Sequence, residues 1–102
     1  MIDVSFVVPS IHINKWPEFY ESIKHSFHGQ WEIIFVGPYD NPKALEFADN
    51  ITCIADWGAP AKCRHRAILA SKGTWICHTA DDTLFIKDEL DKAFKKTNTL
   101  DY

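Results

Sequence analysis

The stretch that decides the fold is WGAPAKCRHRAILASKGTWICHTADDTLF, residues 57–85. It begins with a predicted basic helix over residues 59–72, which Pro60 starts and Gly73 ends. The apolar residues at 74–79 then predict a buried strand, and two adjacent aspartates follow it. A basic helix beside a pair of carboxylates at a strand end favours a diphosphate ligand.

Three further segments have the same continuous apolar character, at residues 2–8, 31–36 and 51–55. Consecutive rather than alternating apolar residues are typical of strands covered on both faces, and such strands form parallel sheets. Parallel strands need crossover connections, so the segments between them are expected to be helical.

The connecting segments do carry apolar residues at helical spacing. A first helix is expected to be capped by Asn14 and to stop at Gly29. A second is expected to start at Pro42, with residues 45–48 supplying its apolar side. A last amphipathic helix is marked by the apolar positions within residues 86–94.

The element order is therefore βαβαβαβα. It predicts an α/β three-layer sandwich with helices on both faces of a mainly parallel four-stranded sheet. Right-handed crossovers give the strand order 3-2-1-4. Open α/β sheets bind ligands at the carboxyl ends of the strands, where the strand order reverses. That point lies between the first and fourth strands, so the loops at residues 9–14 and 80–84 are expected to line a crevice.

Composition indicates a single domain, which we assign to residues 1–102. Hydrophobic residues make up 46% and charged residues 25%, which argues against disorder and against a transmembrane segment. A net charge of −3 argues against nucleic acid as a partner. The N-terminus lacks a signal-peptide pattern and the three cysteines lack disulfide or zinc-site spacing, so we expect a cytoplasmic protein with reduced thiols.

Asp81 and Asp82 are the first candidate site residues. Two carboxylates beside a ligand crevice are hard oxygen ligands, suited to a Mn²⁺ or Mg²⁺ ion that bridges a diphosphate. The alternative is an exposed turn in which one of the two aspartates caps the helix that follows.

Arg64 is the second candidate, because a guanidinium group binds phosphate oxygens through two parallel hydrogen bonds. Arg66 is two positions away and points elsewhere on a helix, so Arg66 and Lys62 are expected to be ordinary surface charges. A solvated helix face is the alternative for Arg64 as well. No GxGxxG motif follows the first strand and no GxxxxGK[ST] motif occurs, so dinucleotide and P-loop sites lose their main support.

Taken together, these segments resemble the N-terminal half of family 2 glycosyltransferases, which have the GT-A fold. The matching segments, in order, are VSFVVPS at 4–10, WEIIFV at 31–36, Arg64-His65, SKGTWI at 71–76 and ADD at 80–82. Each segment is a weak match alone, but their order and spacing agree with the family over nearly the whole chain. The resemblance implies a Rossmann-like half of a nucleotide-diphospho-sugar transferase.

The resemblance also implies roles for particular residues. The loop at Pro9 and Ser10 would line the nucleotide base, and Arg64 would lie near the diphosphate of a nucleotide-sugar donor. Asp82, together with Asp81, would bind Mn²⁺ or Mg²⁺ as a DxD-like motif.

The chain departs from the family at three places. Gly37-Pro38 replaces the acidic pair that contacts the uracil ring, His65 replaces an asparagine, and Ala80 stands in the DxD-like segment. The departures at Gly37-Pro38 and Ala80 motivate an alternative, a non-catalytic remnant or interaction module that binds no nucleotide. A nucleotidyltransferase is a third hypothesis, but the loop at 9–14 lacks the glycine-rich basic character of that class.

Family members carry the catalytic base and the acceptor-binding half beyond the DxD segment. We therefore expect a truncated domain with an unknown acceptor, no catalytic residue of its own and weak or absent transferase activity. A sheet that ends at its fourth strand exposes an edge, so a homodimer is expected.

Overall fold

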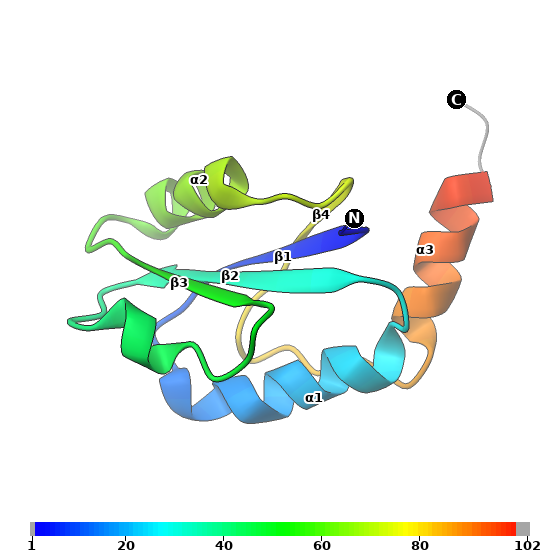
Figure 1. Ribbon diagram of the computed structural model, residues 1–102, viewed down its shortest axis with the longest axis horizontal. Helices are drawn as coiled ribbons and strands as arrows, with labels where there is room; N and C mark the ends of the chain where they lie inside the picture. The colour runs from blue at the N-terminus through cyan, green and yellow to red at the C-terminus, as the bar shows by residue number, and fades with distance from the viewer. Residues whose placement is uncertain (1, 100–102) are drawn as a thin grey trace.

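The computed structural model describes residues 2–99, with side chains described up to residue 95. Four strands alternate with helices along the chain (Figure 1). The elements are β1 (Val4–Pro9), α1 (Trp16–Ser26), β2 (Trp31–Gly37), β3 (Ile51–Ala55), α2 (Pro60–Ala70), β4 (Trp75–His78) and α3 (Glu89–Thr99). Two short 3₁₀ helices, η1 (Ile13–Lys15) and η2 (Pro42–Leu45), complete the described elements.

The strands form one parallel sheet in the order β3-β2-β1-β4, which confirms the predicted topology. Val4 of β1 pairs with Trp31 of β2 on one side and with Trp75 of β4 on the other. Ile33 of β2 pairs with Ile51 of β3. Because all four strands are parallel, their carboxyl ends lie together at one end of the sheet.

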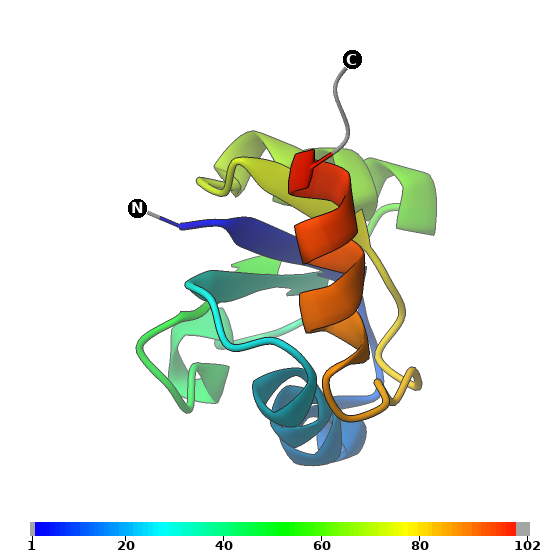
Figure 2. The same ribbon diagram turned by 90° about the vertical axis from the view of Figure 1, so that its right-hand side faces the viewer.

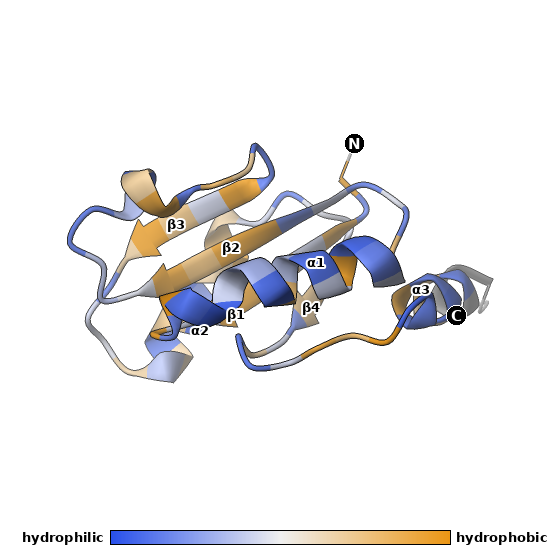
Figure 3. Ribbon diagram, turned by 90° about the horizontal axis from the view of Figure 1, so that it is seen from below, coloured by the Kyte–Doolittle hydropathy of each residue, from blue (hydrophilic) through white to orange (hydrophobic). Residues whose placement is uncertain are grey.

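Both faces of the sheet are covered (Figures 1 and 3). The larger core lies under α1, η2 and α3 and contains Phe6, Trp16, Phe19 and Phe35. The smaller core lies under α2, where Val7, Ile34, Val36, Cys63 and Ala67 are buried. Successive strand residues alternate between the two cores, which is why the strands are apolar at consecutive positions.

Helix α1 begins two residues later than its predicted cap. Residues 13–15 form the 3₁₀ turn η1, and Lys15 rather than Asn14 occupies the N-cap position. The helix also ends at Ser26, before Gly29, because Phe27 turns into an extended conformation and is buried in the larger core. Helix α3 stands across this end of the sheet (Figure 2), where the hydroxyl oxygen of Ser26 accepts a 2.8 Å hydrogen bond from the Leu90 N–H.

The predicted second helix is wrong beyond its first turn. Only Pro42–Leu45 is helical, as a 3₁₀ turn, and Glu46 is already extended. The carboxylate of Glu46 accepts a 2.9 Å hydrogen bond from the backbone N–H of Cys53. β3 is an outer strand of the sheet, so the Cys53 N–H points away from the neighbouring strand. The Glu46 carboxylate satisfies this donor, and residue 46 is extended rather than helical.

Helix α2 covers residues 60–70, shorter at both ends than the predicted 59–72. Its end is fixed by a buried polar pair from the sheet. Glu32 of β2 accepts hydrogen bonds from the Ser5 hydroxyl and the Lys72 N–H, both 2.6 Å. Ser5 in turn accepts one from the Gly73 N–H at 2.7 Å, so these bonds draw the chain away from the helix axis into β4.

Candidate functional site

A cavity of about 210 Å³ lies at the carboxyl ends of β1 and β2, where the loops after β3 and β4 also meet. It is lined by Pro9, Ser10, Ile11, His12, Val36, Gly37, Pro38, Gly58, Pro60, Cys63 and Asp81. This is the position at which open α/β sheets bind ligands. The fold therefore brings together three of the predicted site residues, Pro9, Ser10 and Asp81.

Asp81 is 6% exposed and is held by the loop that follows β1. Its Oδ2 accepts hydrogen bonds from the Ser10 hydroxyl at 2.5 Å and from the His12 N–H at 3.0 Å. The ring of His12 lies 3.3 Å from Oδ1. Burial alone raises the pKa of the Asp81 carboxyl, but the hydrogen bonds from Ser10 and His12 outweigh it and lower that pKa. Asp81 is therefore an anion in a prearranged position.

Ser10 connects this carboxylate to the larger core. The indole N–H of Trp16 donates to the Ser10 hydroxyl oxygen at 2.7 Å, and the Tyr39 hydroxyl donates to the Ser10 carbonyl at 2.9 Å. Trp16 itself stacks on Phe35, with 3.8 Å between the ring centroids. The loop after β1 is thus held by hydrogen bonds from Trp16 and Tyr39, and Trp16 is itself held by its packing on Phe35.

Gly37, at the end of β2, allows the closest approach in the cavity wall. A Cβ atom there would lie 2.1 Å from the Ser10 carbonyl oxygen and 2.9 Å from the Tyr39 hydroxyl. No side chain fits at that distance, so glycine is required for the two loops to meet. The glycine at position 37, one of the departures noted in the sequence, thus has a packing reason in this chain.

Arg64 lies on α2 and is not among the residues that line the cavity. Its Nη1 is 3.3 Å from Nδ1 of His78, the last residue of β4. Arg64 therefore reaches toward the strand that leads into the aspartate pair. It lies one helical turn beyond Pro60 and directly after Cys63, both of which line the cavity.

Lys62 and Arg66 are exposed surface charges as expected, and both also lie near a buried carboxylate. Nζ of Lys62 lies 3.8 Å from Oδ1 of Asp56, and Nη1 of Arg66 lies 3.5 Å from its Oδ2. Sequence reasoning did not single out Asp56, although it directly follows β3 at the same edge as the other site residues. An acidic residue at the carboxyl end of a predicted parallel strand was the available signal.

Asp82 differs from its neighbour, because its side chain is exposed and it does not line the cavity. Mg²⁺ is usually held by one or two carboxylates, with phosphate oxygens and waters completing its ligands. The donors present here, Asp81 and Asp82, fit that description only if a diphosphate supplies further oxygens. The residues suit a metal that arrives with its ligand rather than a preformed cage.

A different acidic group lies at the opposite end of the sheet. His28, Asp88 and Asp91 have ligand atoms within 4.8 Å of one another, and Nδ1 of His28 contacts the Asp91 carboxylate. Asp91 also accepts a 2.7 Å hydrogen bond from the His28 N–H. The group ties the start of α3 to the chain after α1 and takes no part in the cavity.

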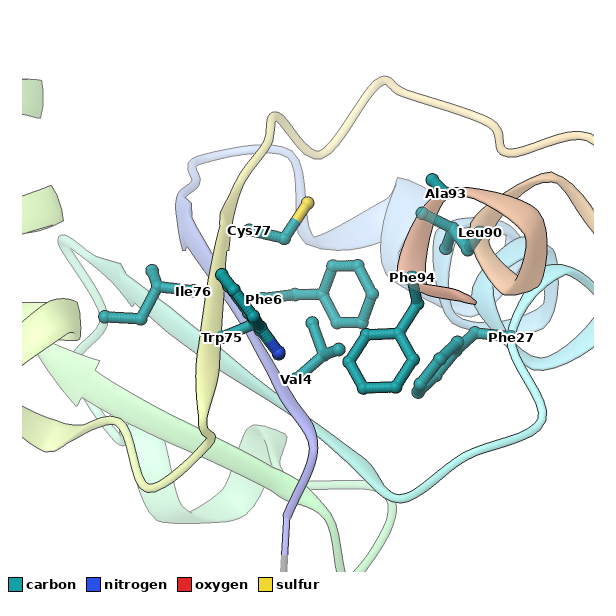
Figure 4. Close-up of a pocket in the computed structure, with 9 residues that line it drawn as sticks. All are labelled: Val4, Phe6, Phe27, Trp75, Ile76, Cys77, Leu90, Ala93 and Phe94. Atoms are coloured by element: carbon teal, nitrogen blue, oxygen red, sulfur yellow. The ribbon is translucent and has the colours of Figure 1, made fainter. Parts of the chain in front are cut away.

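A second cavity, also of about 210 Å³, lies between β4 and α3. Its lining is apolar, and Figure 4 shows the rings of Phe6, Phe27 and Phe94 gathered on one side of it. Cys77, half-buried here, and the buried Cys53 and Cys63 are free thiols whose pKa values burial raises. The predicted role of the cysteines as small packed residues agrees with this placement.

Comparison with known proteins supports the fold at low sequence identity. No protein-family model matches the chain, and no curated protein does. Among solved structures, S. aureus TarS 1–349 matches with a TM-score of 0.71 at 19% identity, over 93% of this chain and 32% of that one. TarS 1–349 in complex with UDP gives a TM-score of 0.71 at 18% identity, over 93% and 31%.

The chain shares the α/β fold of the matching part of TarS 1–349. At these identities the similarity establishes the arrangement of the elements, and this chain spans about a third (32%) of the length of TarS 1–349. Within the described part of the chain, no helix is long and apolar enough to cross a membrane.

Proposed function

We propose that this chain is the nucleotide-diphospho-sugar-binding part of a glycosyltransferase, related to family 2. The observation that carries the proposal is the meeting of Pro9, Ser10 and Asp81 around one cavity at the carboxyl edge of the sheet. The shared fold with TarS, a protein whose structure is known in complex with UDP, supports it.

The cavity is suited to part of such a ligand. Its volume of about 210 Å³ is below the ~300–1,000 Å³ of sites that enclose a whole drug-sized molecule. We assign it to the nucleoside, with Pro9 and Ser10 against the base. The diphosphate and sugar would extend over the surface beyond it.

Two features support a diphosphate at the rim. Helix α2 begins at Pro60 beside the cavity, and its N-cap residue Ala59 provides no side-chain hydrogen bond. The positive end of a helix favours anions. Arg64, one turn further along α2, supplies a cation whose charge does not titrate in the accessible pH range.

Asp81 and Asp82 would hold a Mn²⁺ or Mg²⁺ ion together with the diphosphate oxygens. When bound, such an ion offsets negative charge on the leaving diphosphate. Asp81 contributes a carboxylate whose orientation Ser10 and His12 already fix. We assign no residue of this chain as the base that deprotonates the acceptor, so glycosyl transfer would need an acceptor half supplied in addition.

Isothermal titration calorimetry tests the nucleotide site. UDP, GDP and CDP are titrated separately with Mn²⁺ present and again with EDTA. We expect at least one of them to bind only with the metal. Asp82→Asn and Arg64→Gln should each weaken that binding by about tenfold, which corresponds to ~1.4 kcal/mol.

Matched controls are available far from the cavity. Asp49→Asn changes an exposed aspartate just before the amino end of β3, and Lys24→Gln changes an exposed cation on α1. Both should bind as the unchanged protein does. Absence of binding heat from all three nucleotides at millimolar ligand would reject the proposal, and so would equal affinities for Asp82→Asn and Asp49→Asn.

One observation favours a second candidate, an interaction module that binds no nucleotide. Oδ2 of Asp81 already accepts two hydrogen bonds, from Ser10 and from the backbone of His12, so this carboxylate has a structural role without any metal. The same titrations separate the two candidates, because the module would give no metal-dependent heat.

A further inference from the structure

Asp56 is a buried charge that the proposed function does not use. It directly follows β3, and its side chain is only 4% exposed. Its backbone N–H donates to the Gly37 carbonyl at 2.8 Å, and its Oδ1 accepts from the Gly58 N–H at 2.7 Å. The thiol of Cys63 lies 3.8 Å from its carbonyl oxygen. Gly37, Gly58 and Cys63 all line the cavity, so Asp56 stands directly behind the cavity wall.

The second carboxylate oxygen of Asp56 is exceptional. Among the residues whose side chains are described, Oδ2 of Asp56 is the buried side-chain atom without a hydrogen-bond partner. Its nearest cation is Nη1 of Arg66, at 3.5 Å, and Lys62 approaches Oδ1 at 3.8 Å. A buried carboxylate is costly unless hydrogen bonds and charges compensate it; the Gly58 N–H and these two cations together do so here.

The spacing of the three cations along α2 decides which side of the helix each of them occupies. Lys62 and Arg66 are four residues apart and lie on the same side of the helix, whereas Arg64, midway between them, lies on the opposite side. The structure agrees, because Lys62 and Arg66 turn toward Asp56 after β3 while Arg64 turns toward His78 of β4. Lys62 and Arg66 thus contact Asp56 in the same helix orientation in which Arg64 contacts His78.

We propose that Asp56 is a positioning residue of the site, whose negative charge holds Lys62 and Arg66 and thereby sets both the cavity wall at Gly58 and Cys63 and the direction of Arg64. That Asp56 helps to position a nucleotide site rests on the proposed function. The effect on the wall is a property of the chain itself and is testable without any ligand.

Asp56→Asn is the sharpest variant, because asparagine keeps the shape and the Oδ1 acceptor for the Gly58 N–H but removes the charge. We expect metal-dependent nucleotide affinity to fall by about tenfold, the lower end of what residues behind a site contribute. Arg66→Gln should change affinity in the same direction. The double variant should be no weaker than Asp56→Asn alone, because both substitutions remove one interaction.

Alkylation of Cys63 provides a readout that needs no ligand. This thiol is 4% exposed, and burial raises its pKa, so it should react slowly with iodoacetamide in the unchanged protein. In Asp56→Asn the loosened wall should make Cys63 react several-fold faster by mass spectrometry. Cys53, buried in the other core, serves as the internal reference and should keep its rate.

Glu21→Gln is the matched control, because it removes an acidic partner of His25 on the surface of α1. Circular dichroism checks that each variant is folded. If Asp56→Asn does not fold, the labelling of Cys63 in Arg66→Gln tests the positioning role instead. Unchanged labelling of Cys63 overturns the positioning role, whether or not affinity falls. If the unchanged protein binds no nucleotide, the proposed function fails, while accelerated labelling still supports the effect of Asp56 on the wall.

Discussion

At the scale of single residues, Ser10 shows how the site is arranged before any ligand arrives. Its hydroxyl accepts from the Trp16 indole and donates to Asp81, and its carbonyl accepts from Tyr39. Burial raises the pKa of the Tyr39 hydroxyl, which therefore stays protonated as a donor. A buried network in which every member has a partner has one preferred geometry.

Gly37→Ala is the residue-scale test of this arrangement. The added Cβ would lie 2.1 Å from the Ser10 carbonyl oxygen, a backbone atom that cannot move without displacing β1. We expect the free energy of unfolding to fall by about 1–3 kcal/mol, the usual cost of overpacking. Urea denaturation followed by tryptophan fluorescence measures it.

Gly58→Ala is the comparison variant in the same cavity. Its Cβ would lie 2.7 Å from Cδ of Lys62, part of a flexible exposed side chain, and 2.9 Å from Oδ1 of Asp56. Neither contact is as close as the 2.1 Å contact with a backbone atom at Gly37. The loss of stability should therefore be smaller than for Gly37→Ala. An equal or larger loss at Gly58 would contradict the account of the cavity wall.

At the scale of elements, side chains in the first two turns of α3 attach it to the domain. Leu90 and Phe94 pack on the larger core, and the Asp91 carboxylate pairs with His28. The hydrogen bond to Asp91 raises the pKa of His28, and the neighbouring Asp88 raises it further against the opposing effect of Lys87. Burial acts to raise the pKa of Asp91, but the bonds from His28 outweigh it and lower that pKa.

The attachment of α3 should therefore depend on pH. A raised His28 pKa contributes stability that is complete below its unfolded value of ~6.5 and is lost as pH rises through the folded value. The lowered Asp91 pKa contributes stability above ~3.9 that is lost as pH falls through its folded value. The pair is strongest between about pH 4 and pH 6.5.

Thermal unfolding of the unchanged protein and of His28→Gln measures this effect. The difference in Tm between them should be largest near pH 6 and should shrink toward about pH 9. His65→Gln, which alters an exposed histidine on α2, serves as the control and should show no such trend. A pH-independent difference for His28→Gln would contradict the assigned role of the pair.

At the scale of the whole molecule, β4 is an edge of the described sheet and carries exposed apolar residues. Trp75 is 38% exposed and Ile76 is 39% exposed, beside the apolar cavity under α3. Exposed edges with apolar side chains favour association. We predict that the chain forms a homodimer through this edge.

Light scattering coupled to gel filtration checks the dimer. Ile76→Lys places a charge on the edge and should give a monomer, as natural edge strands use lysine to prevent pairing. Leu69→Lys, at a residue of α2 that is 73% exposed, is the control and should leave the mass unchanged. A monomer for the unchanged protein at all concentrations would reject the prediction.

Most of the fold could be predicted because it depends on local and topological rules. Continuous apolar segments located the strands, and the handedness of crossovers ordered them as 3-2-1-4. The same topology placed Ser10 and Asp81 at one cavity. The segment at 42–48 was predicted incorrectly, because its helical pattern competed with the hydrogen bond from Cys53 to Glu46, which helical spacing cannot show.

The sequence by itself determined the order of the elements and which residues end each strand, because apolar periodicity and glycine or proline stops are local properties of the chain. Only the tertiary structure decided which partner each cation of α2 contacts. Lys62 and Arg66 turn to Asp56 and Arg64 turns to His78, because α2 rests between the ends of β3 and β4. Such pairing depends on which strand ends lie beside α2 in the folded sheet, and no local pattern encodes it.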